Sequence, residues 1–453
     1  MIRLAVLEQT VQELTWLLSS SEPNEEGAFC LLRQGKGTHG CRLLAKELLL
    51  PPAGAWERQG RGILRPGAQW ISSAISCAIT AKAGLLVVHS HPDPHFPLGL
   101  SPIDYEAFES LGKYIAPMLD GPFAAAVVHP HGWSGVLWDG ARIVPIDRIV
   151  KVGRILQFLS PLKQAPDTPL DIRQRDALGV VHDRLRNLTV GLVGYGGLGS
   201  PAAEQLVRMG VGGLVIVDPQ LVDTPSNIRR IFGSTWADAE AMSPPPKVEV
   251  ARRHLEGLAL SVPINCIQGD VRHEAVFRFL LEADVVLVGT DNHGSRAILN
   301  DLAITYLLPV IDVGVRAGAK HKNRLCGLVA EVRVLTPTTP CLWCRKTING
   351  QVIRAEILPA DERRKLIDEG YLTGAFGEAE PSVVALTVFG SGLMTCALLA
   401  TLSEEGEVAP SGYWVDGFLG DARETEPKEP VPGCRCRTNL GLGDCAPQSF
   451  LTA

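Results

Sequence analysis

Apolar residues in the first 150 positions form short runs separated by longer segments. The runs GAFCLL, GLLVVHS and FAAAVV, which begin at Gly27, Gly84 and Phe123, are suited to β-strands. Residues 68–83 and 101–119 instead repeat their apolar positions with a helical period. The pattern predicts a mixed α/β domain over residues 1–150.

The pattern changes after a segment rich in proline and polar residues, SPLKQAPDTPLD. We expect residues 151–187 to be a linker followed by the first helices of a second domain. From Leu188 the runs LTVGLVGYG, GLVIVDPQ, ADVVLVGTD and LPVIDVGV are continuously apolar and alternate with helix-length segments. Strands apolar on both faces predict a Rossmann-like, mainly parallel sheet covered on both sides, over residues 188–445, with a tail at 446–453. Ligands of such sheets bind beyond the carboxyl ends of the strands.

Composition narrows the class of protein. The 453 residues include 46% hydrophobic and 20% charged residues, which supports two or three ordinary cores. A net charge of −6 argues against a nucleic-acid-binding protein. We expect no membrane-spanning helix and no signal peptide. The eleven cysteines are unevenly spread, which favours thiols and metal ligands in a reducing cytoplasm.

The segment VVHSHP, with SPID after it, indicates a metal site in the first domain. Side chains alternate along a strand, so His89 and His91 share one face and can share one zinc ion. Asp104 can be a third ligand, which leaves a fourth position for a water, as in catalytic zinc sites. Ser101 is placed to stabilise an oxyanion. The alternative is a pair of strand histidines without metal, which is how we interpret the second pair, His129 and His131.

These residues resemble the His-x-His-Pro…Ser-x-x-Asp motif of the JAMM (JAB/MPN) metalloproteases, which remove ubiquitin or ubiquitin-like proteins from conjugates. The resemblance covers roughly residues 1–150. It implies an α/β JAMM/MPN domain with a glutamate on an earlier strand as general base. Glu25, three residues before Ala28, fits that position, and Glu26 is the competing candidate.

A glycine-rich segment, VGYGGLGSPAAEQL, follows the first strand of the second domain and opens a helix. Such glycines let the backbone approach a phosphate at a helix N-terminus; here they are Gly194, Gly196, Gly197 and Gly199. Asp218 ends the next strand and is placed for ribose hydroxyls. Further on come cationic and polar residues that suit a nucleoside triphosphate with magnesium, namely Asn227, Arg230, Lys247, Asp291 and Asn292. We interpret Arg229 as a solvated charge. A nicotinamide-dependent dehydrogenase is the alternative.

This second region, residues 170–445, resembles the ThiF/MoeB/HesA family, the adenylating domains of ubiquitin-activating enzymes and sulfur-carrier activators. The matching motifs are G-x-G-G-L-G-S, an aspartate before S-N-I-x-R, a later lysine, and T-D-N…S-R-x-x-x-N. The resemblance implies that Arg230 and Lys247 contact phosphates with help from Asn227, and that Asp291 handles magnesium and the reacting phosphate. It also implies that Arg173 reaches the ATP of a partner subunit, and hence a homodimer.

The sequence departs from the family pattern at two points. Gln220 stands where a second aspartate is usual, and the stretch between Asp218 and Asn227 is one residue longer.

Cysteine pairs predict a structural zinc site in the second domain. Cys341 and Cys344 form a C-x-x-C pair, and Cys434 and Cys436 a later C-x-C pair, with Cys445 as an alternative ligand. A redox dithiol is the alternative for the first pair. For a thioester cysteine, the region from Arg345 to Thr395 offers no candidate. Cys396, in an apolar helix, is expected to be buried, and Cys326 is the remaining option.

Together these patterns predict a bifunctional enzyme of ubiquitin-like protein chemistry. One domain would use ATP to adenylate the C-terminal carboxylate of a Gly-Gly-ended protein. The other would hydrolyse the amide beyond that same C-terminus, in trimming or deconjugation. A downstream conjugating or sulfur-donor protein is a further expected partner. The alternatives are a sulfur-transfer biosynthetic enzyme that makes a thiocarboxylate and a binding module with inactive sites. Fusions of these two domain types occur in bacteria, so we expect a bacterial source.

Overall fold

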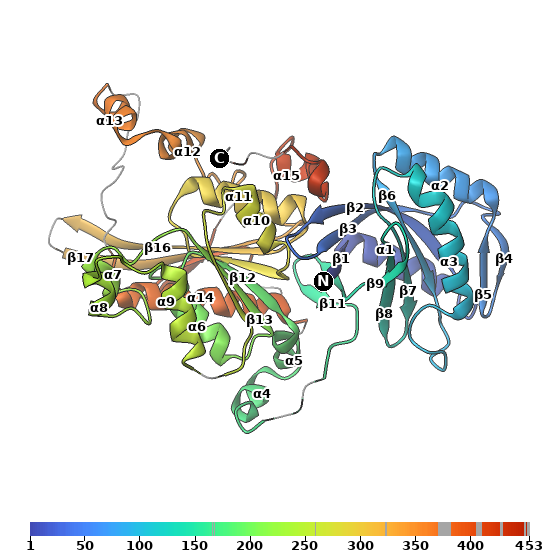
Figure 1. Ribbon diagram of the computed structural model, residues 1–453, viewed down its shortest axis with the longest axis horizontal. Helices are drawn as coiled ribbons and strands as arrows, with labels where there is room; N and C mark the ends of the chain where they lie inside the picture. Colours follow the sequence, from blue (N-terminus) through green and yellow to red (C-terminus); the bar gives the residue numbers. More distant parts are fainter. Residues whose placement is uncertain are drawn as a thin grey trace. The chain divides into compact units, whose positions relative to one another are not determined.

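The computed structural model describes residues 1–164, 166, 168–258, 260–321, 324–369, 382–404, 410–425, 429–447 and 450. The chain divides into two compact units (Figure 1). Unit 1 comprises Met1–Ala165, Thr305–Leu307 and Asn439–Gln448, and unit 2 comprises Pro166–Ile304, Leu308–Thr438 and Ser449–Ala453. Each unit is built on its own large β-sheet.

Unit 1 contains a nine-stranded mixed sheet in the order β11-β10-β1-β3-β2-β6-β7-β8-β9, and a separate hairpin, β4-β5. The predicted strands at Gly27, Gly84 and Phe123 and both predicted helices are confirmed. The elements are β1 (Ile2–Leu7), α1 (Glu8–Ser20), β2 (Gly27–Lys36), β3 (Cys41–Leu49), β4 (Trp56–Gly60), β5 (Ile63–Pro66), α2 (Ala68–Thr80), β6 (Gly84–Ser90), α3 (Pro102–Ile115), η1 (Ala116–Met118), β7 (Phe123–His129), β8 (Gly132–Trp138), β9 (Ile143–Pro145), β10 (Arg148–Val152), β11 (Leu156–Phe158) and η2 (Gly443–Cys445).

Both faces of this sheet are buried, each in its own hydrophobic core. Alternate side chains of β2 enter opposite cores, because successive residues of a strand point to opposite faces. Cys30 packs with Leu14 of α1 on one face. Phe29 packs with Ala74 of α2 and Phe108 of α3 on the other. The central strands β2 and β6 are therefore covered on both faces, and β6 carries His89 near its end, with His91 directly after it.

Unit 1 continues past the predicted end of the first domain at residue 150, because β10 pairs with β1 and β11 pairs with β10. It also includes two later segments. The buried Arg42 donates hydrogen bonds to the carbonyl oxygens of Tyr306 (2.9 Å) and Leu307 (2.8 Å). The Tyr306 hydroxyl in turn donates to Asp444 over 2.9 Å.

Unit 2 contains an eight-stranded sheet in the order β14-β13-β12-β15-β16-β17-β18-β19. The four predicted apolar strands are confirmed as β12, β13, β15 and β16. The elements are α4 (Ile172–Leu178), α5 (Val180–Asn187), β12 (Thr189–Val193), α6 (Gly199–Arg208), β13 (Gly213–Asp218), α7 (Pro225–Ile228), α8 (Trp236–Glu240), α9 (Lys247–Glu256), β14 (Ile264–Gln268), α10 (Glu274–Leu280), β15 (Val285–Val288), α11 (His293–Thr305), β16 (Val310–His321), β17 (Arg324–Leu335), α12 (Gly350–Ile357), α13 (Ala360–Asp368), α14 (Val384–Leu402), β18 (Gly412–Asp416), β19 (Asp421–Glu424) and α15 (Arg435–Thr438).

The prediction of a mainly parallel sheet holds for only one part of unit 2. Strands β14, β13, β12, β15 and β16 are parallel, whereas β17, β18 and β19 continue the sheet in antiparallel pairs. Antiparallel neighbours need no helical crossover, so β16 passes directly into β17. In the parallel part the chain order reverses between β12 and β15. A ligand crevice is expected at such a switch point.

One helix, α14, is long and apolar enough to cross a membrane by length and composition, although we expected none. Half of it is buried inside unit 2, where it packs on β16, β17 and α6. Its Ser391 hydroxyl donates to the Leu198 carbonyl (2.6 Å), and its Thr395 hydroxyl donates to Gln205 (2.7 Å). These contacts are typical of the core helix of a covered sheet.

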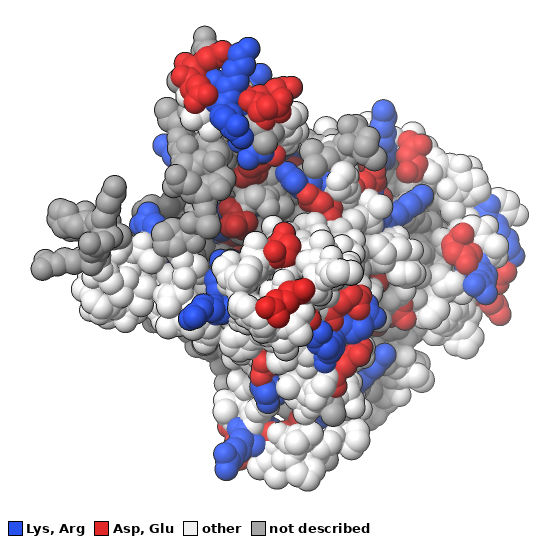
Figure 2. Space-filling model, turned by 60° about the vertical axis from the view of Figure 1, so that its left-hand side comes forward, with Lys and Arg blue, Asp and Glu red and all other residues white. Residues whose placement is uncertain are grey.

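Charged side chains of both signs are interspersed on the face shown in Figure 2, which has no extended basic surface. The mixture agrees with the net charge of −6.

Candidate functional site

The start of α3 explains how Asp104 is aimed. Ser101 is the N-cap, Pro102 is the first helical residue, and Asp104 completes a capping box. The Asp104 N–H donates to Ser101 Oγ (3.2 Å), and the Ser101 N–H donates to Asp104 Oδ2 (2.7 Å). The Ser-x-x-Asp spacing therefore has a local structural cause, and it holds the carboxylate rigidly at the helix N-terminus.

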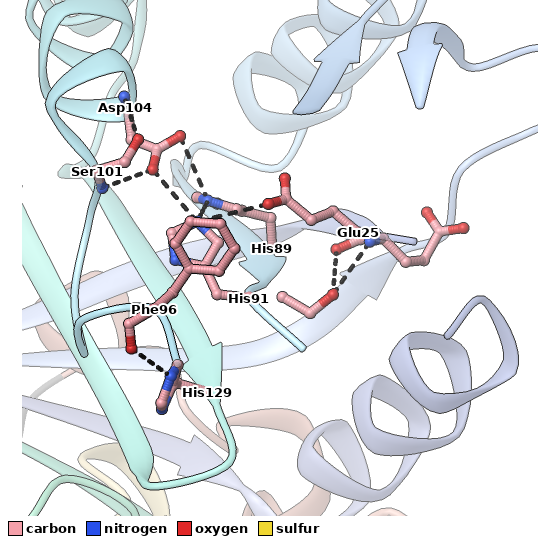
Figure 3. Close-up of polar contacts among 9 residues, drawn as sticks. Glu25, His89, His91, Phe96, Ser101, Asp104 and His129 are labelled. Carbon is pink, nitrogen blue, oxygen red and sulfur yellow. Dashed lines mark hydrogen bonds and ion pairs between the residues drawn. The ribbon is translucent and has the colours of Figure 1, made fainter. Parts of the chain in front are cut away.

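The carboxylate of Asp104 meets both predicted histidines (Figure 3). The Nε2 atoms of His89 and His91 are 3.2 Å apart, and they lie 3.5 Å and 3.4 Å from Asp104 oxygens. A tetrahedral zinc ion with bonds of 2.0–2.1 Å separates its N and O ligands by about 3.3–3.4 Å. The three side chains therefore bring one ligand atom each close enough together to share a single zinc ion, and three protein ligands leave its fourth position for a water.

Two adjacent glutamates, Glu25 and Glu26, are equally buried but point to different partners. Glu25 Oε1 lies 3.9 Å from His91 Nε2, so its carboxylate faces the open side of the cluster (Figure 3). Its backbone is held by the β4-β5 hairpin, since the Glu25 N–H donates to the Gly60 carbonyl (3.1 Å) and Gln59 donates to the Glu25 carbonyl (3.1 Å). This geometry favours Glu25 over Glu26 as the general base.

Glu26 is occupied by structural hydrogen bonds. Its carboxylate accepts from the Ser21 hydroxyl (2.8 Å), the Gly27 N–H (2.9 Å) and the Gln59 amide (2.9 Å). Gln59 thus binds the carboxylate of Glu26 but only the backbone carbonyl of Glu25. No pattern in the sequence predicts this role of Gln59.

Charge and burial shift the pKa values of the two carboxyl groups in this cluster, Glu25 and Asp104. Burial raises the pKa of the Glu25 carboxyl, while the charges of His89 and His91 oppose that rise. Burial also disfavours a charged Asp104, but hydrogen bonds from His89 and His91 outweigh it and hold the Asp104 pKa well below its usual range. Asp104 therefore stays ionised as a metal ligand must, whereas Glu25 is closer to taking up a proton.

The second histidine pair, His129 and His131, is separate from this cluster. His129 is buried at the end of β7, and its Nε2 lies 3.1 Å from the Phe96 carbonyl oxygen. The His131 N–H donates to His129 Nδ1 over 3.1 Å. This agrees with the strand-end interpretation, but it adds a hydrogen bond to the loop after His91 that sequence reasoning missed.

In unit 2 the glycine loop connects β12 to α6. Gly194 has a φ of +95°, a left-handed conformation that favours glycine. A side chain at Gly199 would collide with the Gly194 carbonyl oxygen at 1.8 Å, whereas one at Gly196 would meet nothing within 4 Å. The space over Gly196 leaves the loop backbone open to a ligand. Gly197 lies against α14, because a side chain there would meet Thr387 at 3.0 Å.

Asp218, at the end of β13, holds this loop in place by hydrogen bonds. Its buried carboxylate accepts from the Tyr195 N–H (2.7 Å) and the Gln220 N–H (2.8 Å), and burial raises its pKa. Gln220, the departure from the family pattern, accepts a hydrogen bond from the Lys247 ammonium over 2.6 Å. The neutral amide therefore holds the lysine beside Asp218. Contact of Asp218 with a ribose stays a prediction.

The segment after β13 brings further predicted residues towards the loop. Asn227 is buried in α7, and its amide lies 3.4 Å from Asp223. Arg230 is half-buried, with its Cβ 3.5 Å from the place a side chain would take at Gly197. Arg229 is exposed, as expected for a solvated charge.

Asp291 and Asn292 follow the carboxyl end of β15. Asp291 is exposed and close enough to Asp218 to raise the pKa of that carboxyl. The Asn292 side chain accepts from the Ser295 N–H (2.7 Å) and so caps α11. The side-chain oxygen of Asn292 is thus used at the helix end, whereas the exposed carboxylate of Asp291 can bind a cation. Magnesium prefers such oxygen ligands.

Arg173 is an exposed residue of α4 in unit 2. Its predicted role towards a partner subunit's ATP stays a prediction.

Four thiols meet in unit 2, namely Cys341, Cys344, Cys434 and Cys436. Neighbouring sulfur atoms are 3.6 Å (Cys341–Cys344 and Cys341–Cys434) and 3.7 Å (Cys344–Cys436) apart. Zinc–sulfur bonds of 2.3 Å separate tetrahedral thiolates by about 3.8 Å, so the four fit a closed structural zinc site. Both members of the C-x-C pair take part, and Cys445 is an exposed residue outside this group.

The expectation for Cys396 is wrong, because the residue is exposed on α14. A helix that is apolar all round has no pattern to show which residues face outwards. Cys326 is partly buried in β17.

Residues 172–436 match the model of the ThiF family. The chain belongs to the ThiF family. The match includes the glycine loop, Lys247, Asp291 and all four clustered cysteines, and it begins after the histidine cluster of unit 1.

Among curated relatives, the chain is similar to the Sulfur carrier protein ThiS adenylyltransferase of Bacillus subtilis (strain 168), at 30% identity over 161 residues. That alignment covers 36% of this chain and 44% of the relative. The SAMP-activating enzyme E1 of Haloferax volcanii is 32% identical over 161 residues, 36% of this chain and 54% of the relative. The chain therefore spans about half the length of these relatives.

Among solved structures, the chain is similar to the crystal structure of E. coli MccB with ATP. The TM-score is 0.45 at 16% identity, over 59% of this chain and 74% of that one.

Proposed function

We propose that this ThiF-family protein adenylates the C-terminal carboxylate of a ubiquitin-like or sulfur-carrier protein ending in Gly-Gly. The main support is the family match together with the glycine loop, where a side chain at Gly196 would meet nothing within 4 Å and Arg230 lies near Gly197. Lys247 and Asp291 both lie close enough to Asp218, which holds this loop, to shift its pKa. The relatives named above include an activator of a sulfur carrier, ThiS.

In this reaction an oxygen of the substrate carboxylate attacks the α-phosphorus of ATP, the bond to the β-phosphate breaks, and pyrophosphate leaves with the electron pair. Loop N–H groups at the start of α6 hold phosphate oxygens. Lys247 and Arg230 balance charge on the attacked and departing phosphates. A magnesium ion at Asp291 would supply further charge neutralisation. The product is an acyl-adenylate.

Unit 1, we propose further, is a JAMM-type zinc peptidase that hydrolyses an amide beyond the same C-terminus. The observation that carries this is the cluster of His89, His91 and Asp104 at 3.2–3.5 Å, with Glu25 facing its open side. A zinc ion held there would supply a Lewis acid. Glu25 takes a proton from the attacking water and passes it to the departing amine. The Ser101 oxygen accepts the Asp104 N–H, so its hydroxyl proton stays available for the amide carbonyl oxygen.

A homodimer is also proposed. Its support is the outward face of α14, a helix without a charged residue on which Val384 (42% exposed) and Val388 (37%) lie open. The dimer would let Arg173 act in the partner subunit's site.

The adenylation proposal is tested by ATP–pyrophosphate exchange with a panel of Gly-Gly-ended ubiquitin-like proteins. We expect exchange that depends on one of these proteins and is lost in Asp291→Asn. Arg229→Gln is the matched control, because it removes an exposed charge near the site and should leave exchange unchanged. Exchange without any protein substrate, or equal exchange in Asp291→Asn, contradicts the proposal.

A second candidate function is sulfur transfer, favoured by the ThiS-activating relatives. The adenylate would then be converted to a thiocarboxylate. Mass spectrometry of the product protein separates the two outcomes. A gain of sulfur that needs a sulfur donor indicates transfer, whereas an adduct to a lysine-bearing acceptor indicates conjugation.

A further inference from the structure

His129 of β7 connects the end of one strand to the loop that follows the metal-binding strand β6. It is only 4% exposed, and both of its ring nitrogens lie at hydrogen-bonding distance from backbone groups. One is the Phe96 carbonyl, in the loop between His91 and Ser101 (Figure 3). The buried imidazole therefore joins two segments that are 33 residues apart in the chain.

The two contacts fix the protonation of the ring. The His131 N–H is a donor, so His129 Nδ1 must accept and carries no proton. The Phe96 carbonyl oxygen is an acceptor, so Nε2 must be protonated and donate. His129 is thus held as one neutral tautomer, and its Nε2–H fixes the position of Phe96.

The loop fixed in this way meets His91 through Phe96. The Phe96 ring lies beside the His91 ring, with centroids 6.3 Å apart. The Nε2 atom of His91 faces Asp104 and Glu25. Groups around a ligating histidine that restrict rotation of its ring keep the ligating nitrogen aimed at the metal.

We propose that His129 is a positioning residue of the unit 1 metal site, which acts through Phe96 to orient His91 for zinc. The inference rests on the proposed function of unit 1. It assigns no direct contact between His129 and the metal or the substrate.

The test is zinc affinity of the full chain, measured by competition with a chromophoric chelator. The binding step that is lost in His91→Ala reports the unit 1 site and separates it from the four-cysteine site. His129→Phe keeps a buried ring but removes the donor to Phe96. His129→Gln can still donate an amide N–H to that carbonyl. His131→Ala is the matched control, since it removes an exposed imidazole and keeps the backbone N–H that His129 accepts.

We expect His129→Phe to weaken zinc binding at this site by about tenfold, the low end of the effect of groups that orient ligands, with His129→Gln and His131→Ala staying close to wild type. His129→Phe leaves the Phe96 carbonyl and the His131 N–H without their buried partner, so its zinc-free melting temperature should fall. Zinc affinities are therefore compared at a temperature at which wild type and every variant are folded. Equal affinity in His129→Phe and wild type, or equal weakening in His131→Ala, overturns the proposal. If His129→Phe does not fold, a folded His129→Gln in which zinc binding at this site is weakened about tenfold or more overturns the proposal.

The failure of the proposed function would look different. In that case wild type itself would show no zinc-binding step beyond that of His91→Ala, whatever the His129 variants do.

Discussion

Exchanging each of the two adjacent glutamates for glutamine is a sharp test of how unit 1 works. Glu25 and Glu26 are both 7% exposed, so burial alone does not distinguish them. Glu25 faces the histidine cluster, whereas Glu26 accepts three hydrogen bonds from Ser21, Gly27 and Gln59. The structure therefore predicts that one variant loses chemistry and the other loses stability.

Glu25→Gln removes the proton acceptor but keeps the size of the side chain. Loss of a general base lowers the rate of peptide cleavage by about 10²–10⁴-fold, while zinc content and melting temperature stay close to wild type. Cleavage is followed by mass spectrometry on a Gly-Gly-ended protein that carries a short C-terminal extension.

Glu26→Gln has the opposite expected effect. The amide oxygen can still accept from Ser21 and Gln59, but the amide N–H₂ then faces the Gly27 N–H, which is a donor. Loss of one hydrogen bond to a buried charged group costs about 2 kcal/mol. In a unit of this size that lowers the melting temperature by about 4–8 °C. Residual cleavage by the folded fraction should be retained. A stable Glu26→Gln without cleavage, beside an active Glu25→Gln, would refute the assignment.

Three further predictions follow from particular contacts. Gly199→Ala should destabilise unit 2, because its Cβ would meet the Gly194 carbonyl oxygen at 1.8 Å. Gly196→Ala should instead keep the wild-type melting temperature and lose ATP affinity in a titration. Equal behaviour of the two variants would contradict the loop geometry. Cys341→Ser should lower both the amount of bound zinc, measured by elemental analysis, and the unfolding temperature of unit 2. Cys445→Ser should change neither quantity. Asp238 has its pKa lowered to about 2, chiefly by the hydrogen bond from Arg253. A carboxyl whose pKa is lowered by folding stabilises the protein above its unfolded pKa, and this contribution is lost as the pH falls through its folded pKa. Asp238→Asn should therefore lower the free energy of unfolding at pH 7, and denaturant titrations should show that deficit narrowing between pH 5 and pH 2; a constant deficit would refute it.

Local patterns were enough to predict much of the fold. The apolar runs that became β6, β12, β13 and β15 are continuous and bounded by glycine or polar residues, and Ser101 with Asp104 forms a capping box within four residues. These features depend on neighbours in the sequence. The same holds for the glycine loop, where the tight turn at Gly194 is a local requirement.

Features set by distant segments could not be predicted. The choice between Glu25 and Glu26 depends on Gln59 in the β4-β5 hairpin, and the role of His129 depends on a loop over 30 residues away. The antiparallel extension of the unit 2 sheet begins where β17 pairs with β16, which periodicity alone does not indicate. Cys396 was misjudged because every face of α14 is apolar, so only packing decides which side is buried.

The claim that both units act on one C-terminus is tested most directly by pyrophosphate exchange with two forms of the same Gly-Gly-ended protein, one mature and one extended by a short tail. We predict that wild type supports exchange with both forms, that His91→Ala supports it only with the mature form, and that Asp291→Asn supports neither. Undiminished exchange by His91→Ala with the extended form, or no exchange by wild type with the mature form, would contradict the account.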